Sequence, residues 1–215
     1  MLFRILAIAG LLLSYVFVFR ILRRRNLTIG QFLRTGGKRL SGFDDSSISR
    51  RQAATKSWYI LALISIKILA ITGFLQVMIL GEHMSGFLLL LHMIAAPAFA
   101  VAIAILTLLT ISDHRFSAED WQAFRSRKDN TEAASNFWRK TCYWLIVVSS
   151  IPAIASIILS MYPIFGTNGQ EALLSWHRYA TLVLTIAVIF HTFLIFEASP
   201  RQQGTLEETK PAPAQ

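Results

Sequence analysis

Residues 175–196 read SWHRYATLVLTIAVIFHTFLIF, an apolar run that carries two histidines, His177 and His191. A helix that crosses a bilayer needs about 20 consecutive apolar residues, and this run is long enough. The two histidines are 14 positions apart (191 minus 177), which at about 100° per residue places them on nearly the same face, about 21 Å apart along the axis. We therefore expect one membrane helix that presents two imidazoles at opposite depths.

Four other stretches have a comparable length and composition, at residues 2–19, 58–80, 86–111 and 141–162. Hydrophobic residues make up 54% of the chain and charged residues 15%, and the mean hydropathy is +0.51. A soluble domain carries about 25% charged residues, so this composition excludes a soluble domain with a polar shell. The sequence predicts an all-α integral membrane protein with five transmembrane helices.

The first stretch differs from a secretory signal peptide in its flanking charges. One basic residue, Arg4, precedes its centre, and a dense basic run at residues 20–25 follows it. A signal peptide has the opposite arrangement and a small-residue cleavage site. We therefore expect residues 1–20 to be a retained N-terminal transmembrane helix that is additional to the other four.

Lys and Arg alternate between the loops. The segment between the first two spans holds ten and the segment between the third and fourth holds six, whereas loops 81–85 and 163–173 hold none. By the positive-inside rule, the chain is predicted to cross the membrane with its N-terminus outside and its C-terminus in the cytoplasm. The net charge of +9 is then explained by topology and anionic lipid, and no nucleic-acid partner is expected.

These spans divide the chain into four parts. They are the extra helix at 1–20, a basic cytoplasmic linker at 21–57, a four-helix bundle at 58–198 and a polar, disordered cytoplasmic tail at 199–215. The single cysteine, Cys142, excludes a disulfide framework and any iron–sulfur cluster or cysteine-based zinc site held by this chain alone.

His92 and His177 form the predicted pair. His92 lies near the outer end of the third span and His177 near the outer end of the fifth, and these two helices run in the same direction. Small residues follow each at the next turn, which would leave room for a porphyrin, so we expect the two to ligate a b haem. The alternative is a pair of buried polar side chains that hydrogen-bond neighbouring helices. Arg178 is expected to pair with a haem propionate, unless it is only an interface anchor.

His191 faces the inner leaflet and has no obvious histidine partner. His114 follows His92 by 22 residues, about 33 Å along a helix, so it is expected to snorkel at the cytoplasmic surface. Lys67 lies mid-span at a depth similar to that of His191. It could ligate an inner haem, contact a propionate or a quinone carbonyl, or snorkel without a cofactor role. His83 is expected to be a loop histidine.

Three segments resemble the membrane cytochrome b subunits of formate dehydrogenase, nickel–iron hydrogenase and thiosulfate reductase, the bacterial cytochrome b561-like family. They are ITGF at 71–74, LLLLHMIAAPAFAVAIAIL in the third span and WHRYATLVLTIAVIFHTFLIFEA in the fifth. The resemblance covers residues 58–198. It implies a bacterial inner membrane, with the N-terminus periplasmic and the C-terminus cytoplasmic. It also implies that His92 and His177 bind an outer haem and that His191 binds an inner one.

The family's partner for His191 lies early in the helix that ends in the Thr-Gly pair, where this chain has Trp58 and Tyr59. Either the inner haem has a substitute ligand such as Lys67, or it is lost and His191 serves a quinone or structural role. The resemblance implies an electron-transfer subunit of a hetero-oligomeric respiratory oxidoreductase. It would connect quinone to a periplasmic cytochrome c, iron–sulfur or molybdenum protein through one or two b haems. The alternative function is a haem-free membrane anchor or assembly subunit.

Overall fold

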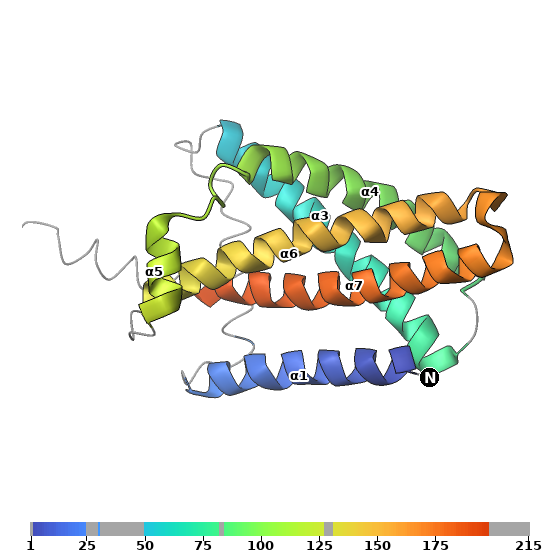
Figure 1. Ribbon diagram of the computed structural model, residues 1–215, viewed down its shortest axis with the longest axis horizontal. Coiled ribbons are helices and arrows are strands. Elements are labelled where there is room, and N and C mark those ends of the chain that lie inside the picture. Colours follow the sequence, from blue (N-terminus) through green and yellow to red (C-terminus); the bar gives the residue numbers. More distant parts are fainter. Residues whose placement is uncertain (1, 25–29, 31–49, 82–83, 127–130, 198–215) are drawn as a thin grey trace, which may run out of the picture.

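A computed structural model describes residues 2–24, 30, 50–81, 84–126 and 131–197, and within these ranges the chain forms helices and no strand (Figure 1). The elements are α1 (Leu2–Arg24), α3 (Arg50–Leu75) with its π-helical extension η1 (Gln76–Leu80), α4 (Gly86–Thr110), α5 (Ala118–Ser126), α6 (Thr131–Ser160), the 3₁₀ turn η2 (Pro163–Phe165) and α7 (Gly166–Glu197). Most of the predicted linker, the tail and His83 lie outside the described residues.

Five of these helices, α1, α3, α4, α6 and α7, are long and apolar enough to cross a membrane. This confirms the predicted all-α fold with five spans. Large apolar side chains are exposed along them, including Leu108 at 79%, Phe87 at 74% and Ile71 at 65%. Such surfaces are stable in lipid but not in water, so the chain is a multi-pass membrane protein that contacts lipid.

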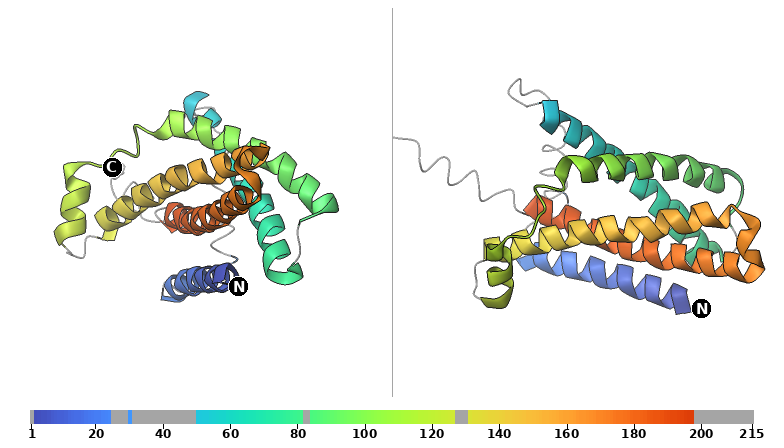
Figure 2. Two further views of the ribbon diagram at one scale, coloured as in Figure 1. Left: turned by 45° about the vertical axis from the view of Figure 1, so that its right-hand side comes forward. Right: turned by 45° about the horizontal axis from the view of Figure 1, so that its top comes forward.

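The four last spans pack as two antiparallel pairs. α3 packs along α4 and α6 packs along α7, whereas contacts between the two pairs are sparse (Figures 1 and 2). One apolar cluster joins all four helices through Ile66, Phe99, Ile146 and Leu184. Leu184 lies midway in sequence between the two histidines of α7, so this cluster occupies the middle of the bundle. A cavity lies between the two pairs on the His191 side of this cluster.

The additional helix α1 lies along α7, on the opposite side of the bundle from α4 (Figures 1 and 2). Phe3 contacts Tyr179 with ring centroids 5.4 Å apart, and Phe17 contacts Phe190 at 5.2 Å. Phe3 precedes Phe17 in α1, and their partners follow the same order in α7, so the two helices run in the same direction. A first and a fifth span must be parallel when successive spans cross the membrane in alternate directions, and this packing therefore agrees with five crossings.

The short helix α5 is fastened to α6 by an ion pair. Lys140 Nζ donates to Asp120 Oδ2 at 2.6 Å, and both side chains are largely buried, 17% and 9% exposed. Asp120 also accepts from the backbone N–H of Ser117, whose hydroxyl accepts from the N–H of Asp120 at 3.3 Å. This reciprocal arrangement is a capping box, and it fixes where α5 begins.

The same carboxylate makes stability depend on pH. Burial alone would raise the pKa of Asp120, but the hydrogen bonds from Lys140 and Ser117 outweigh burial and lower the pKa from its usual value of 3.8. A carboxyl with a lowered folded-state pKa stabilises the fold above its unfolded-state pKa, and this contribution is lost as the pH falls through the folded-state value. Thermal unfolding in detergent should therefore lose less stability on acidification in Asp120→Asn than in the wild type. An equal loss of thermal stability on acidification in the two proteins would contradict this prediction.

Candidate functional site

His92 and His177 lie together between the two helix pairs. Their ring centroids are 6.5 Å apart, with an angle of 71° between the ring planes, and both side chains are half-buried. When two imidazoles bind one metal ion from opposite sides through bonds of about 2.0–2.1 Å, their ring centroids lie roughly 6.4 Å apart. The structure therefore brings the predicted pair to the separation that a shared metal requires.

Hydrogen bonds fix which nitrogen of each ring is available. Thr72 Oγ1 donates to the carbonyl of Ile68 at 2.7 Å, which leaves a lone pair of this oxygen to accept from His92 Nδ1, 2.8 Å away. His177 Nδ1 lies 2.8 Å from the carbonyl oxygen of Ala153, which can only accept. Both rings thus carry their proton on Nδ1 and have the lone pair on Nε2. Metal-bound histidines are held in this way by an oxygen at the other nitrogen.

Small residues surround this pair. A Cβ added to Gly73 would meet His92 Cε1 at 3.6 Å, so the Thr-Gly pair of α3 both orients the ring and lies against it. Ala95 is buried one turn after His92, and Ala180 is half-buried one turn after His177. The predicted propionate partner, Arg178, is exposed beside His177.

At the other end of α7, the structure corrects the prediction for His114. Its ring is half-buried, stacks on Tyr143 at 3.8 Å and lies 6.3 Å from the ring of His191, which is 7% exposed. The predictions that His114 snorkels at the surface and that His191 lacks a histidine partner were therefore wrong. They failed because α4 ends at Thr110 and the chain then turns, with Asp113 N–H donating to the Thr110 carbonyl at 3.0 Å. Ser112 and Asp113, both poor in a helix interior, were the signal for this end.

Lys67 lies elsewhere. Its side chain is exposed on α3, beside the exposed Ile64 and near Ile71. The cavity that His191 lines also includes Leu63 and Ile66 of the same helix but not Lys67. The structure does not bring Lys67 to His191.

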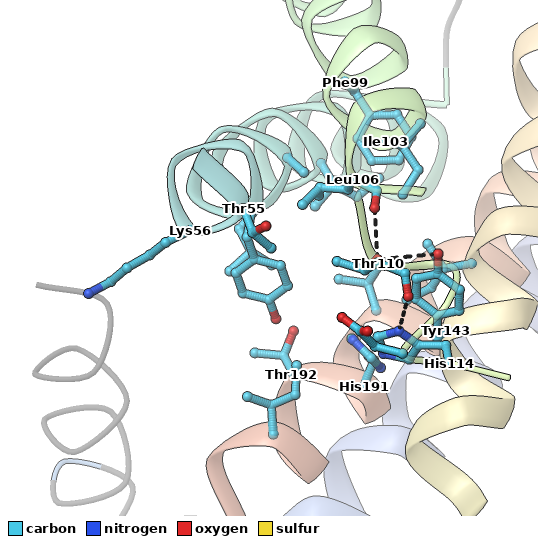
Figure 3. Close-up of a pocket in the computed structure, with 18 of the residues that line it drawn as sticks. Thr55, Lys56, Phe99, Ile103, Leu106, Thr110, His114, Tyr143, His191 and Thr192 are labelled. Atoms are coloured by element: carbon cyan, nitrogen blue, oxygen red, sulfur yellow. Dashed lines mark hydrogen bonds between the residues drawn. The ribbon is translucent and has the colours of Figure 1, made fainter. Parts of the chain in front are cut away.

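That cavity has a volume of about 570 Å³ and lies between the α3–α4 and α6–α7 pairs. Figure 3 shows His114, His191 and Tyr143 gathered below Thr110, with Thr192 to the left of His191. The buried hydroxyl of Tyr59 also lines it and makes no hydrogen bond to any described residue, although Thr192 lies near. A largely apolar pocket with a few converging polar groups is typical of a ligand site.

Charges near the mouth of the cavity act on His114. Burial lowers the pKa of its imidazole; the hydrogen bond to Thr110 and the carboxylate of Asp113 act in the opposite direction, and the cation of Arg139 adds to the lowering. Arg51 donates to the carbonyl of Leu109 at 2.6 Å and pairs with Asp113 at 3.6 Å, so it ties the start of α3 to the end of α4. The net effect is a lowered pKa of His114, which favours the neutral imidazole.

The two histidine clusters contain two imidazoles each, and no group of three or more His, Cys, Asp or Glu residues that could hold a metal ion occurs in the described ranges. A structural zinc takes four protein ligands and a catalytic zinc takes three. Two axial imidazoles suit an iron whose remaining ligands belong to a porphyrin. No family model, curated protein or solved structure matches the chain.

Proposed function

We propose that this chain is a membrane-embedded b-type cytochrome that passes electrons between the quinone pool and a periplasmic redox partner. The observation that carries the proposal is the His92–His177 pair, with rings 6.5 Å apart and both Nδ1 atoms placed on oxygen acceptors. A b haem held there would supply a one-electron iron couple. The chain's own residues would orient the two imidazoles and keep the site within an apolar bundle.

Placement within the membrane supports the electron-transfer role. His177 lies towards the start of α7 and His191 towards its end, about 21 Å further along the axis. With the predicted topology, the His92–His177 pair lies near the periplasmic side. There it could exchange electrons with a cytochrome c, iron–sulfur or molybdenum protein, while quinone is reached from within the membrane.

Lys67 supports assembly with another subunit. It lies mid-span on α3, is exposed and forms no hydrogen bond or ion pair with another described residue. A charged side chain in the middle of a membrane helix costs about 2.5–3.5 kcal/mol, so such residues normally face protein or water. A carboxylate on a transmembrane helix of a partner subunit would satisfy Lys67, in agreement with a hetero-oligomer.

The direct test is the cofactor content of the chain purified in mild detergent after expression in a haem-replete host. The proposal predicts at least one b haem per chain by pyridine haemochrome, a low-spin oxidised spectrum and reduction by a short-chain quinol. A folded, helical preparation without haem would refute it and favour the haem-free membrane anchor.

Substitution of Thr72 tests whether this residue orients His92. Thr72→Val removes the oxygen that accepts from His92 Nδ1 and leaves that N–H without a partner, whereas Thr72→Ser keeps the hydroxyl. Loss of such an orienting contact typically weakens metal binding about 10–100-fold. Haem transfer to an excess apo-globin should accelerate to a similar extent in Thr72→Val and remain near the wild-type rate in Thr72→Ser. Equal rates in all three proteins would contradict the assigned role of Thr72.

A further inference from the structure

The cavity at the end of α7 contains a second imidazole pair of the same kind as the first. The rings of His114 and His191 are 6.3 Å apart, close to the roughly 6.4 Å expected for two imidazoles on one metal ion. They come from different parts of the fold, His114 from the turn after α4 and His191 from α7. Neither histidine belongs to the His92–His177 pair.

Hydrogen bonds again determine which ring nitrogen of each histidine carries the proton. His114 Nδ1 lies 2.9 Å from the carbonyl of Thr110, and His191 Nδ1 lies 3.3 Å from the carbonyl of Arg139. A carbonyl can only accept, so both protons are on Nδ1 and both Nε2 atoms have a free lone pair. The Thr110 carbonyl, at the end of α4, accepts from the N–H of Asp113 at 3.0 Å and has a second lone pair for His114 Nδ1.

The surroundings suit a large, flat, amphipathic ligand. Apolar side chains of all four helices line the cavity, and its volume of about 570 Å³ is within the range of about 300–1,000 Å³ that is usual for cofactor sites. The start of α3 lines one edge of the cavity with two basic residues, Arg51 and Lys56. Arg51 pairs with Asp113, which also lines the cavity, and Figure 3 shows Lys56 extending outwards. An apolar ring with anionic substituents could lie in the cavity with its carboxylates towards these cations.

From this geometry we infer that His114 and His191 ligate the iron of a second b haem, with one axial ligand supplied by the turn after α4 and none by α3. Trp58 and Tyr59 begin the apolar part of α3, and the Tyr59 hydroxyl lines the same cavity as His114. This inference rests on the proposed function, because it adds a second haem to a chain that is proposed to bind one.

The experiment compares haem stoichiometry and low-spin EPR signals in the detergent-purified wild type, His114→Ala, His92→Ala and the double variant. We expect two haems in the wild type, one in each single variant with a different EPR signal surviving in each, and none in the double variant. The remaining haem of His114→Ala also shows that this variant folds. Added imidazole should restore the lost signal of His114→Gly, because it can occupy the space of the missing ring.

The outcomes separate the two proposals. One haem in the wild type that is retained in His114→Ala and lost in His92→Ala would overturn the second site and leave the proposed function intact. Two haems that both persist in His114→Ala would also overturn it, since His114 would then not be a ligand. Folded wild-type protein without any haem would refute both proposals.

Discussion

If the proposed function is correct, replacing His92 with alanine removes one b haem from each chain and with it the electron transfer to an external acceptor. Iron in a porphyrin needs an axial ligand from each side in a low-spin b site, and His92 is the imidazole that faces His177 at 6.5 Å. The loss should be complete rather than partial, because Ala offers no ligand atom. Haem per chain and the rate of acceptor reduction by quinol would be measured on the same preparation.

Two controls make this result specific to ligation. Met93→Ala changes the next residue of α4, whose side chain is 51% exposed, and should leave haem content unchanged. His92→Met keeps a ligand but exchanges imidazole for a thioether, which raises the reduction potential of haem proteins. A His92→Met protein with wild-type potential, or a His92→Ala protein with wild-type haem content, would show that His92 is not an axial ligand.

The five spans were predictable because hydropathy alone determines them in a membrane. Except for α4, the observed helices are longer than the apolar windows, as α6 and α7 show: α6 begins at Thr131, ten residues before the predicted 141, and α7 begins at Gly166, nine residues before the run at 175–196. The extra turns contain polar residues, and helix formation outside a membrane does not need an apolar sequence. A hydropathy window therefore locates a crossing but not the ends of its helix.

The His92–His177 pair was predictable from depth and helix direction, since both residues lie within regular helices. His114 was not, because it follows the end of α4 and a constant rise per residue no longer applies there. The roles of Thr72 and Ala153 also needed the structure, because each acts through a contact between helices that are distant in sequence. Periodicity assigns a residue to a face and a depth, whereas tertiary packing decides which oxygen lies opposite each Nδ1.

Replacing Lys140 is expected to lower the stability of the protein strongly. Lys140→Met should destabilise the protein by about 3 kcal/mol, because it leaves the Asp120 carboxylate largely buried without its counter-ion. This is the lower end of the range for a broken buried ion pair, since Ser117 still donates to the same carboxylate. Arg125→Met removes an exposed cation on α5 and should change stability by no more than about 0.5 kcal/mol. Unfolding in detergent, followed by tryptophan fluorescence, would measure the three proteins.

A double variant distinguishes the ion pair from simple packing by Lys140. Asp120→Asn added to Lys140→Met removes the unpaired charge, while the side-chain oxygen of the introduced amide can still accept from the N–H of Ser117. The double variant should therefore be more stable than Lys140→Met alone, by about 1–2 kcal/mol, because neutral groups cost less to bury than an unpaired charge. Additive losses would instead mean that the methylene stem of Lys140, and not its charge, holds α5 against α6.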